Sequence, residues 1–169
     1  PKKYQKYQLH GNQIEIFYIQ NIKHWVALKK YLIKDRRLFL LLWNEQKFVE
    51  KDIEKMAKKM IKLNLAWIQI KGVESARTEF LFDHICITNW IKSHDEKDLE
   101  LMTDNNSKAS FDSTLNFITH ALDYDKKINY QRIILICSNN EKLYNKINKY
   151  FQSEINLTAD KSIIGNNFN

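Results

Sequence analysis

The chain has 169 residues, of which 44% are hydrophobic and 12% aromatic, with only three glycines and one proline. These values are typical of a folded domain of mostly regular structure and exclude a disordered or collagen-like chain. No apolar run approaches the roughly 18 residues of a membrane span, and no apolar stretch follows the basic N-terminus as in a signal peptide. We therefore expect a single cytoplasmic domain over residues 1–169, with no membrane partner.

The net charge of +7 is distributed unevenly along the chain. Residues 1–62 carry a net charge of +9, residues 63–125 carry −6 and residues 126–169 carry +4. An acidic middle between two basic ends favours a surface matched to a charged partner over a uniform nucleic-acid groove. Cys86 and Cys137 lie in apolar runs, so we expect reduced core residues and not a disulfide framework.

The N-terminal part predicts a β-hairpin followed by a helix. Residues 4–9 and 13–19 flank a His-Gly-Asn turn, and side chains alternate with period two over 13–19, which predicts a β-hairpin or a strand pair within residues 1–19. Apolar residues at helical spacing then predict a helix over 21–34.

Apolar runs predict strands at 37–43, 65–71 and 131–137. The first and third runs do not alternate, which predicts strands buried on both faces, as in a parallel sheet covered by helices. Amphipathic stretches predict helices at 49–61, 111–122 and 138–151. Strands alternating with helices predict an α/β fold: a three-layer, mainly parallel, Rossmann-like sheet with an N-terminal β-hairpin.

The segment between the second and third of these strands is harder to interpret. Residues 74–82 predict a short helix and the apolar run at 84–90 a further strand. Residues 91–109 are polar and predict a mobile insertion or a partly helical loop. The chain after Ile155 is expected to be loosely ordered.

Open parallel sheets bind ligands beyond the carboxyl ends of their strands, here at 44–47, 72–75, 89–94 and 138–140. Three scattered glycines cannot form a dinucleotide-binding or phosphate-binding loop. The five histidines lack the context of a catalytic triad, and the cysteines lack an electropositive neighbour that would activate a thiol. We therefore expect no cofactor, no metal and no catalytic residue, and an enzyme is the less favoured interpretation.

The strand element Gln69-x-Lys71 is a variant of the Asp/Glu-x-Lys element of metal-dependent nucleases, in which carboxylates hold a metal beside a lysine. The nearest upstream acids, Asp52 and Glu54, fall in a predicted helix and should not converge with Lys71. A strand end with a solvated lysine is the favoured interpretation.

Two charged clusters are candidate partner surfaces. The acidic cluster comprises His94, Asp95, Glu96, Asp98, Glu100 and Asp104. These residue types could bind a metal, but a metal site needs ligands held in a fixed geometry and the segment is irregular. A solvated loop is therefore favoured, with a contact surface for a basic partner as the functional alternative. The basic cluster could bind phosphates or form a solvated helix face, and it comprises Lys29, Lys30, Lys34, Arg36, Arg37, Lys51, Lys55, Lys58, Lys59 and Lys62.

Four segments together resemble a family of small bacterial α/β domains of unknown function, namely 65–72, 87–90, 110–118 and 132–138. The resemblance covers about residues 37–142 and implies the fold only. Members of that family carry a histidine after a Thr-x-Trp step, where this chain has Ile91, and a short acidic link where this chain has the long polar insertion.

By type, a small bacterial α/β protein without a catalytic constellation resembles the immunity proteins of toxin–immunity pairs, including those of contact-dependent inhibition. The leading hypothesis is therefore a non-catalytic protein-binding module that neutralises a cognate toxin by covering its active site. Residues 95–104 would contact a basic toxin, or the lysine face an acidic one. The alternative is a nucleic-acid-acting protein, either a metal-dependent nuclease or a toxin domain.

Overall fold

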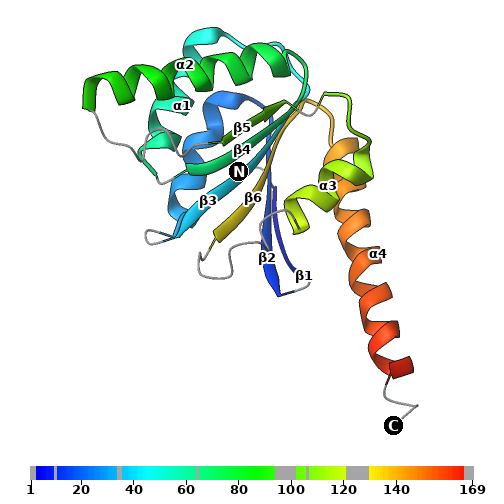
Figure 1. Cartoon of the computed structure of the whole chain (residues 1–169). Helices are drawn as coiled ribbons and strands as arrows, with labels where there is room; N and C mark the ends of the chain where they lie inside the picture. The colour runs from blue at the N-terminus through cyan, green and yellow to red at the C-terminus, as the bar shows by residue number, and fades with distance from the viewer. Residues whose placement is uncertain are drawn as a thin grey trace.

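The computed structural model describes residues 3–9, 11–33, 36–63, 65–93, 102–105, 107–120 and 130–165. In these ranges, helices alternate with the strands of one sheet (Figure 1). The elements are β1 (Lys3–Leu9), β2 (Asn12–Ile19), the 3-10 helix η1 (Ile22–Tyr31), β3 (Arg37–Asn44), α1 (Glu50–Ile61), β4 (Leu65–Gly72), α2 (Ser75–Ser93), β5 (Met102–Asn105), α3 (Phe111–His120), β6 (Tyr130–Cys137) and α4 (Lys142–Gly165).

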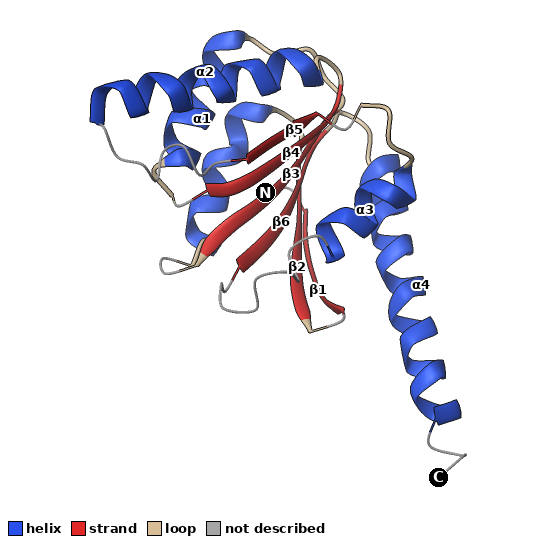
Figure 2. Cartoon of the chain, in the orientation of Figure 1, coloured by secondary structure: helices blue, strands red, loops and turns tan. Residues whose placement is uncertain are grey.

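The sheet is mixed and has the strand order β1-β2-β6-β3-β4-β5 (Figure 2). Only β1 and β2 pair antiparallel, and all other neighbours are parallel. The α/β class, the predominance of parallel pairing and the N-terminal hairpin are thus confirmed. Gly11 turns the hairpin with a φ of 80°, a conformation that favours glycine.

The two central strands, β6 and β3, are covered on both faces, which explains their unbroken apolar sequences. Leu40 and Ile133 contribute to the core under η1, α1 and α2, whereas Leu41 and Ile134 contribute to the core under α3 and α4. Helices therefore lie on both faces of the sheet, as Figure 1 shows.

The strand predicted at 84–90 is wrong, because these residues form the second half of α2. Phe82, Ile85 and Cys86 are buried, a spacing that fits one side of a helix. Ile87, which alternates with Ile85 in the sequence, is 51% exposed instead. The apolar run at 84–90 reflects a helix with two apolar sides and not a strand.

Two further expectations are corrected. In the insertion predicted at 91–109, residues 91–93 belong to α2 and residues 102–105 form the strand β5, which pairs with β4 at the sheet edge, whereas 94–101 and 106 lie outside the described residues. The tail predicted after Ile155 continues α4 as a helix to Gly165, with no proline to interrupt it. The helix predicted at 21–34 is confirmed as the 3-10 helix η1, whose first turn is capped by Asn21 through a 2.9 Å bond from the backbone N–H of Lys23.

No helix in the described part of the chain is long and apolar enough to cross a bilayer.

Candidate functional site

The crevice beyond the carboxyl ends of β2, β6 and β3 is where a ligand of a parallel sheet is expected. Its cavity is only about 90 Å³ and includes Asn44 and Cys137 in its lining. The backbone N–H of Ser138 donates to Ile19 at 3.1 Å, and that of Glu45 donates to Cys137 at 2.9 Å. Backbone hydrogen bonds thus join three strand ends across the crevice.

Side chains close the same crevice further. The Asn44 side chain, 1% exposed, donates to the carbonyl of Gln46 at 2.7 Å, and the Ser138 hydroxyl donates to the Glu45 carboxylate at 2.9 Å. Gly72 has a φ of 103°, and a Cβ there would lie 2.0 Å from the Asn44 carbonyl oxygen. The side chains of Asn44 and Ser138 are therefore hydrogen-bonded within the chain, and the small cavity leaves little room for a ligand.

Of the four rim segments predicted from the sequence, 44–47, 72–75 and 138–140 lie at strand ends as expected. The segment 89–94 does not: its first five residues belong to α2, and His94 lies outside the described residues.

The Gln69-x-Lys71 element lies on β4 with its two side chains toward α3, whereas Asp52 lies on α1, which packs on the other face. The Lys71 ammonium donates to the carbonyl of Ala109 at 2.6 Å and sits 5.4 Å from the Trp43 ring centroid, and its burial lowers the pKa of Lys71. Gln69 is fully buried, and its amide has no hydrogen-bond partner in the described structure. Within the described ranges, no three acids, histidines or cysteines gather as metal ligands.

The acidic cluster predicted as a partner surface lies mostly beyond the described structure, since His94, Asp95, Glu96, Asp98 and Glu100 fall outside the described residues. Its last member, Asp104, is half-buried on β5, in register with Gln69 of β4. A contact role for the first five residues therefore stays a prediction.

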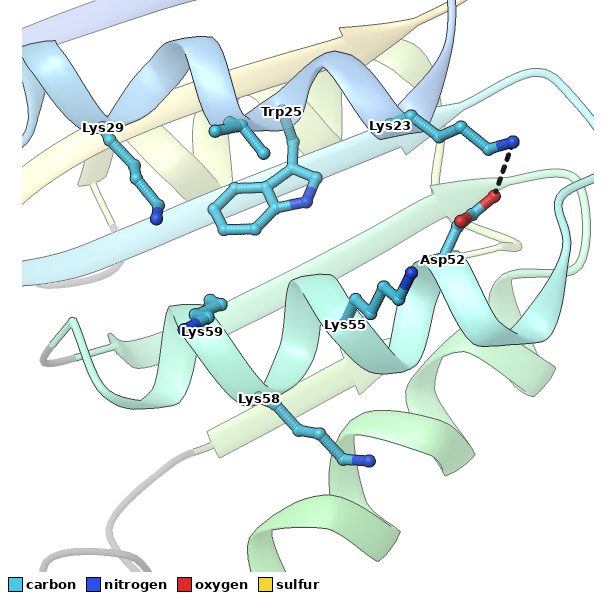
Figure 3. A pocket seen from close by; sticks show the side chains of 8 residues that line it. Lys23, Trp25, Lys29, Asp52, Lys55, Lys58 and Lys59 are labelled. Carbon is cyan, nitrogen blue, oxygen red and sulfur yellow. Dashed lines mark ion pairs between the residues drawn. The ribbon is translucent and has the colours of Figure 1, made fainter.

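Part of the basic cluster lines a groove of about 660 Å³ between η1 and α1, shown in Figure 3. The indole of Trp25 extends from η1 into the space between the two helices and is only 4% exposed, so it forms an apolar floor. Val26 lies beside it and is 51% exposed. Lysines from both helices line the groove, namely Lys23, Lys29, Lys55, Lys58 and Lys59. Of these, Lys23 extends toward Asp52, and Lys58 points away from Trp25 toward α2 (Figure 3).

The periodicity of α1 explains this arrangement. Ile53, Met56, Ala57 and Met60 anchor the helix in the core, which turns its lysines outward. Lys55 and Lys59, one turn apart, lie on the side of α1 that faces η1 (Figure 3).

Only part of the positive charge in the groove is compensated. Asp52, the single acid in the lining, pairs with Lys23 at 3.6 Å, and Glu54 pairs with Lys58 at 3.8 Å. Lys29 lies 5.8 Å from the centroid of the Trp25 ring, a cation–π distance. Within the described ranges no ion pair is found for Lys29, Lys55 or Lys59. The groove therefore combines an apolar floor with at least three cations available to an anionic partner.

Sequence reasoning found the lysines but not the groove. The spacing of Lys55 and Lys59 placed both on one helix face, but nothing in the sequence placed Lys29 and Trp25 opposite them, because that depends on how η1 packs against α1.

Comparisons with protein-family models, with curated proteins and with solved structures find no match to this chain.

Proposed function

We propose that this chain is a non-catalytic protein-binding module that holds an acidic surface of its partner in the groove between η1 and α1. The observation that carries the proposal is the set of uncompensated cations, Lys29, Lys55 and Lys59, above the buried indole of Trp25. Protein interfaces combine an apolar centre with complementary charges, which steer association and select the partner.

The form of the groove favours a protein partner over a nucleic acid. Single strands bind proteins through bases stacked on exposed aromatic rings, and Trp25 is too deeply buried to offer a ring face. The cations are all lysines, without an arginine fork that would grip phosphates in two places. A protein surface fits the groove better: its carboxylates would pair with the lysines, and an aliphatic side chain would pack on the exposed Val26.

We further propose that the partner is a bacterial toxin and that the chain is its immunity protein. The resemblance by type to immunity proteins supports this role. The cavity at the strand ends supports it too, because about 90 Å³ leaves little room for a substrate. The toxin would present an acidic surface to the lysine groove, and covering that surface would block its active site.

We also propose that the fold that carries the groove is three-layered and Rossmann-like. Separate core clusters on the two faces of the sheet support this interpretation.

The test uses the product of the adjacent gene as the candidate toxin. We expect it to inhibit growth when expressed alone, and we expect coexpression of this chain to relieve the inhibition. Surface plasmon resonance should show binding that Lys55→Glu with Lys59→Glu weakens at least about tenfold. The matched control, Lys51→Glu with Lys62→Glu, reverses exposed charges outside the groove and should change affinity less than about twofold. The absence of binding at micromolar concentration, or equal loss in both variants, would contradict the proposal.

A nucleic-acid-acting protein is the second candidate, favoured by the net charge of +7 and by the groove lysines. Binding to labelled RNA or DNA would weaken steeply with salt, with a slope of about −0.7 per neutralised phosphate on a single strand. Cleavage in the presence of Mg²⁺ or Mn²⁺, or binding with such a slope that Lys55→Glu with Lys59→Glu abolishes, would establish this alternative instead.

A further inference from the structure

The charge of the groove between η1 and α1 changes from one end to the other. Near the N-terminal ends of the two helices, Lys23 and Asp52 form an ion pair at 3.6 Å. Lys29 and Lys59 lie in the last turns of η1 and α1, and in the described ranges no ion pair is found for either. Figure 3 shows the ion pair and these two lysines at opposite ends of the groove. The groove is therefore neutral at one end and positive at the other.

Neither acids nor helix dipoles cancel the charge of the positive end. η1 contains no acidic residue, and the acids of α1 all lie within residues 50–54, where each is paired with a cation. The C-terminal ends of the two helices add roughly half a negative charge each. Together they amount to about one charge, which is less than the full charges of Lys29, Lys55 and Lys59.

The lining of the groove offers hydrogen-bond donors and apolar surface. The lysine ammonium groups and the indole N–H of Trp25 can only donate, and Val26 is apolar. Asp52, the single acid in the lining, is held by Lys23 at the neutral end. Both walls are helices, whose interior backbone groups are hydrogen-bonded within each helix. A segment bound in the groove must therefore bring acceptors, and its own backbone N–H groups must already be satisfied.

An α-helix meets this requirement, whereas an extended strand does not. The N–H groups of a helix beyond its first turn bond to its own carbonyls, but those of a strand would leave water without gaining a partner in the groove. Lys55 and Lys59 are one turn apart, about 6 Å along α1, so carboxylates one turn apart on a bound helix match their spacing. An aliphatic side chain of that helix would cover Val26, which is 51% exposed on the opposite wall.

We propose that the groove holds an α-helix of the partner, with carboxylates beside Lys29, Lys55 and Lys59 and an aliphatic side chain on Val26. The acidic end of this helix lies where η1 and α1 end, and its uncharged end lies over the Lys23–Asp52 pair. This inference rests on the proposed function, because it assumes that the groove binds an acidic protein, and it adds the form and the polarity of the bound segment.

The probe for the form of the segment is a stapled helical peptide of about four turns, with glutamates one turn apart in its N-terminal half and a leucine on the same face. Fluorescence anisotropy near 0.15 M salt should show that it binds the full chain. An unstapled copy with a central proline keeps every charge but breaks the helix, and it should bind at least about tenfold more weakly.

A nitroxide at the N-terminus of the stapled peptide tests the polarity. It should broaden the amide NMR signals of Lys29 and Lys59 more than those of Lys23 and Asp52. The matched control is a stapled peptide with the glutamates in its C-terminal half. Its N-terminal nitroxide should broaden the signals of the opposite end, because the acidic end would again lie over the uncompensated lysines.

Variants of the chain test the contacts themselves. Lys55→Glu with Lys59→Glu should reverse the charge preference, so that a lysine counterpart of the peptide binds more tightly than the glutamate peptide. Val26→Ser should weaken the glutamate peptide by about threefold or more, since an apolar contact is lost. Ile33→Ser is the control, because Ile33 is 40% exposed outside the groove lining, and it should leave the affinity within about twofold.

Several outcomes would overturn the inference. Equal binding of the stapled and proline peptides would mean that no helix is required, and equal broadening at both ends would remove the polarity. Displacement of the peptide by single-stranded RNA would assign the groove to a nucleic acid. A homodimer that Lys55→Glu with Lys59→Glu dissociates would assign it to a second copy.

The peptide and toxin experiments also separate this inference from the proposed function. Toxin binding that depends on Lys55 and Lys59, with no binding of the stapled peptide, would overturn the inference and leave the proposed function standing. Binding of the stapled peptide without binding of the toxin would contradict the toxin assignment and support the helix-binding groove. The absence of both would contradict both proposals.

Discussion

The crevice at the strand ends and the groove between η1 and α1 differ in what their polar groups bind. In the crevice, the side chains of Asn44 and Ser138 are both hydrogen-bonded to neighbouring residues of the same chain. In the groove, Lys29, Lys55 and Lys59 have no ion pair in the described structure. Satisfied polar groups stabilise a fold, whereas uncompensated surface charges are available to a partner. The difference supports the proposal that the groove binds a partner, whereas the hydrogen bonds of the crevice stabilise the fold.

The largest effect is expected from Gly72→Ala at the end of β4, where Gly72 packs against the backbone of Asn44 beside the crevice. The new Cβ would lie 2.0 Å from the Asn44 carbonyl oxygen, and alanine is strained at a φ of 103°. We expect the free energy of unfolding to fall by about 3 to 5 kcal/mol in urea denaturation. Gly11→Ala is the control: it also has a positive φ, of 80°, but no atom lies within 4 Å of the new Cβ. It should cost about 1 to 2 kcal/mol. Equal losses would mean that the crevice can relax.

A smaller loss is expected from Asn44→Ala. The substitution leaves the carbonyl and N–H of Gln46 without their partners at 2.7 and 3.3 Å, and we expect a loss of about 1 to 3 kcal/mol. Gln46→Ala removes a donor to the carbonyl of Gln20, which water can replace, so the unfolding free energy should change by less than about 0.5 kcal/mol. The reverse order of these two losses would contradict the crevice's structural role.

The third prediction concerns Cys137, which lines the crevice and is 1% exposed. Burial raises the pKa of its thiol to about 12. In a Cys86→Ser background, the native protein should therefore not react with Ellman's reagent near pH 8, whereas the unfolded chain should react fully. Rapid modification of the native protein would show that the crevice is open.

The same pKa shift makes stability depend on pH in a defined direction. Above about pH 9 the unfolded chain loses the Cys137 proton while the folded chain keeps it, so the unfolded state binds fewer protons. The free energy of unfolding should therefore fall as pH rises from about 9 to 12, by up to about 1.4 kcal/mol per pH unit from this thiol. Burial also raises the pKa of Tyr18, which adds to the slope at higher pH. Cys137→Ala should flatten the dependence near pH 9 to 10, which urea titrations at several pH values can measure.

The smallest effect on stability is expected in the groove. Lys55→Glu with Lys59→Glu changes exposed side chains and should alter the unfolding free energy by less than about 0.5 kcal/mol, although it should abolish most partner binding. A loss of stability comparable to that of Asn44→Ala would mean that the lysines stabilise the fold and would remove the distinction between groove and crevice.

Sequence patterns correctly predicted two kinds of element: strands that are buried on both faces, and helices whose apolar residues recur at a regular helical spacing. The runs containing Leu40 and Ile134 indicated strands covered on both faces, and the apolar face of α1, with Ile53 and Met60, indicated a helix. The pattern failed at α2. Ile85 and Ile87 alternate as in a strand, but one is buried by the sheet and the other faces outward. The sequence records hydrophobicity and does not record which apolar residue the rest of the chain covers.

The candidate sites show the same division. The sequence by itself determined the α/β class, the mainly parallel sheet and the presence of lysines along one side of α1. Only the tertiary structure decided that Lys29 and Trp25 of η1 face Lys55 and Lys59, that Gly72 closes against Asn44, and that α2 leaves one apolar side uncovered. The physical reason is that local periodicity follows from the backbone geometry of each segment. Grooves and exposed stripes, in contrast, arise where segments distant in sequence pack together or leave a surface unpaired.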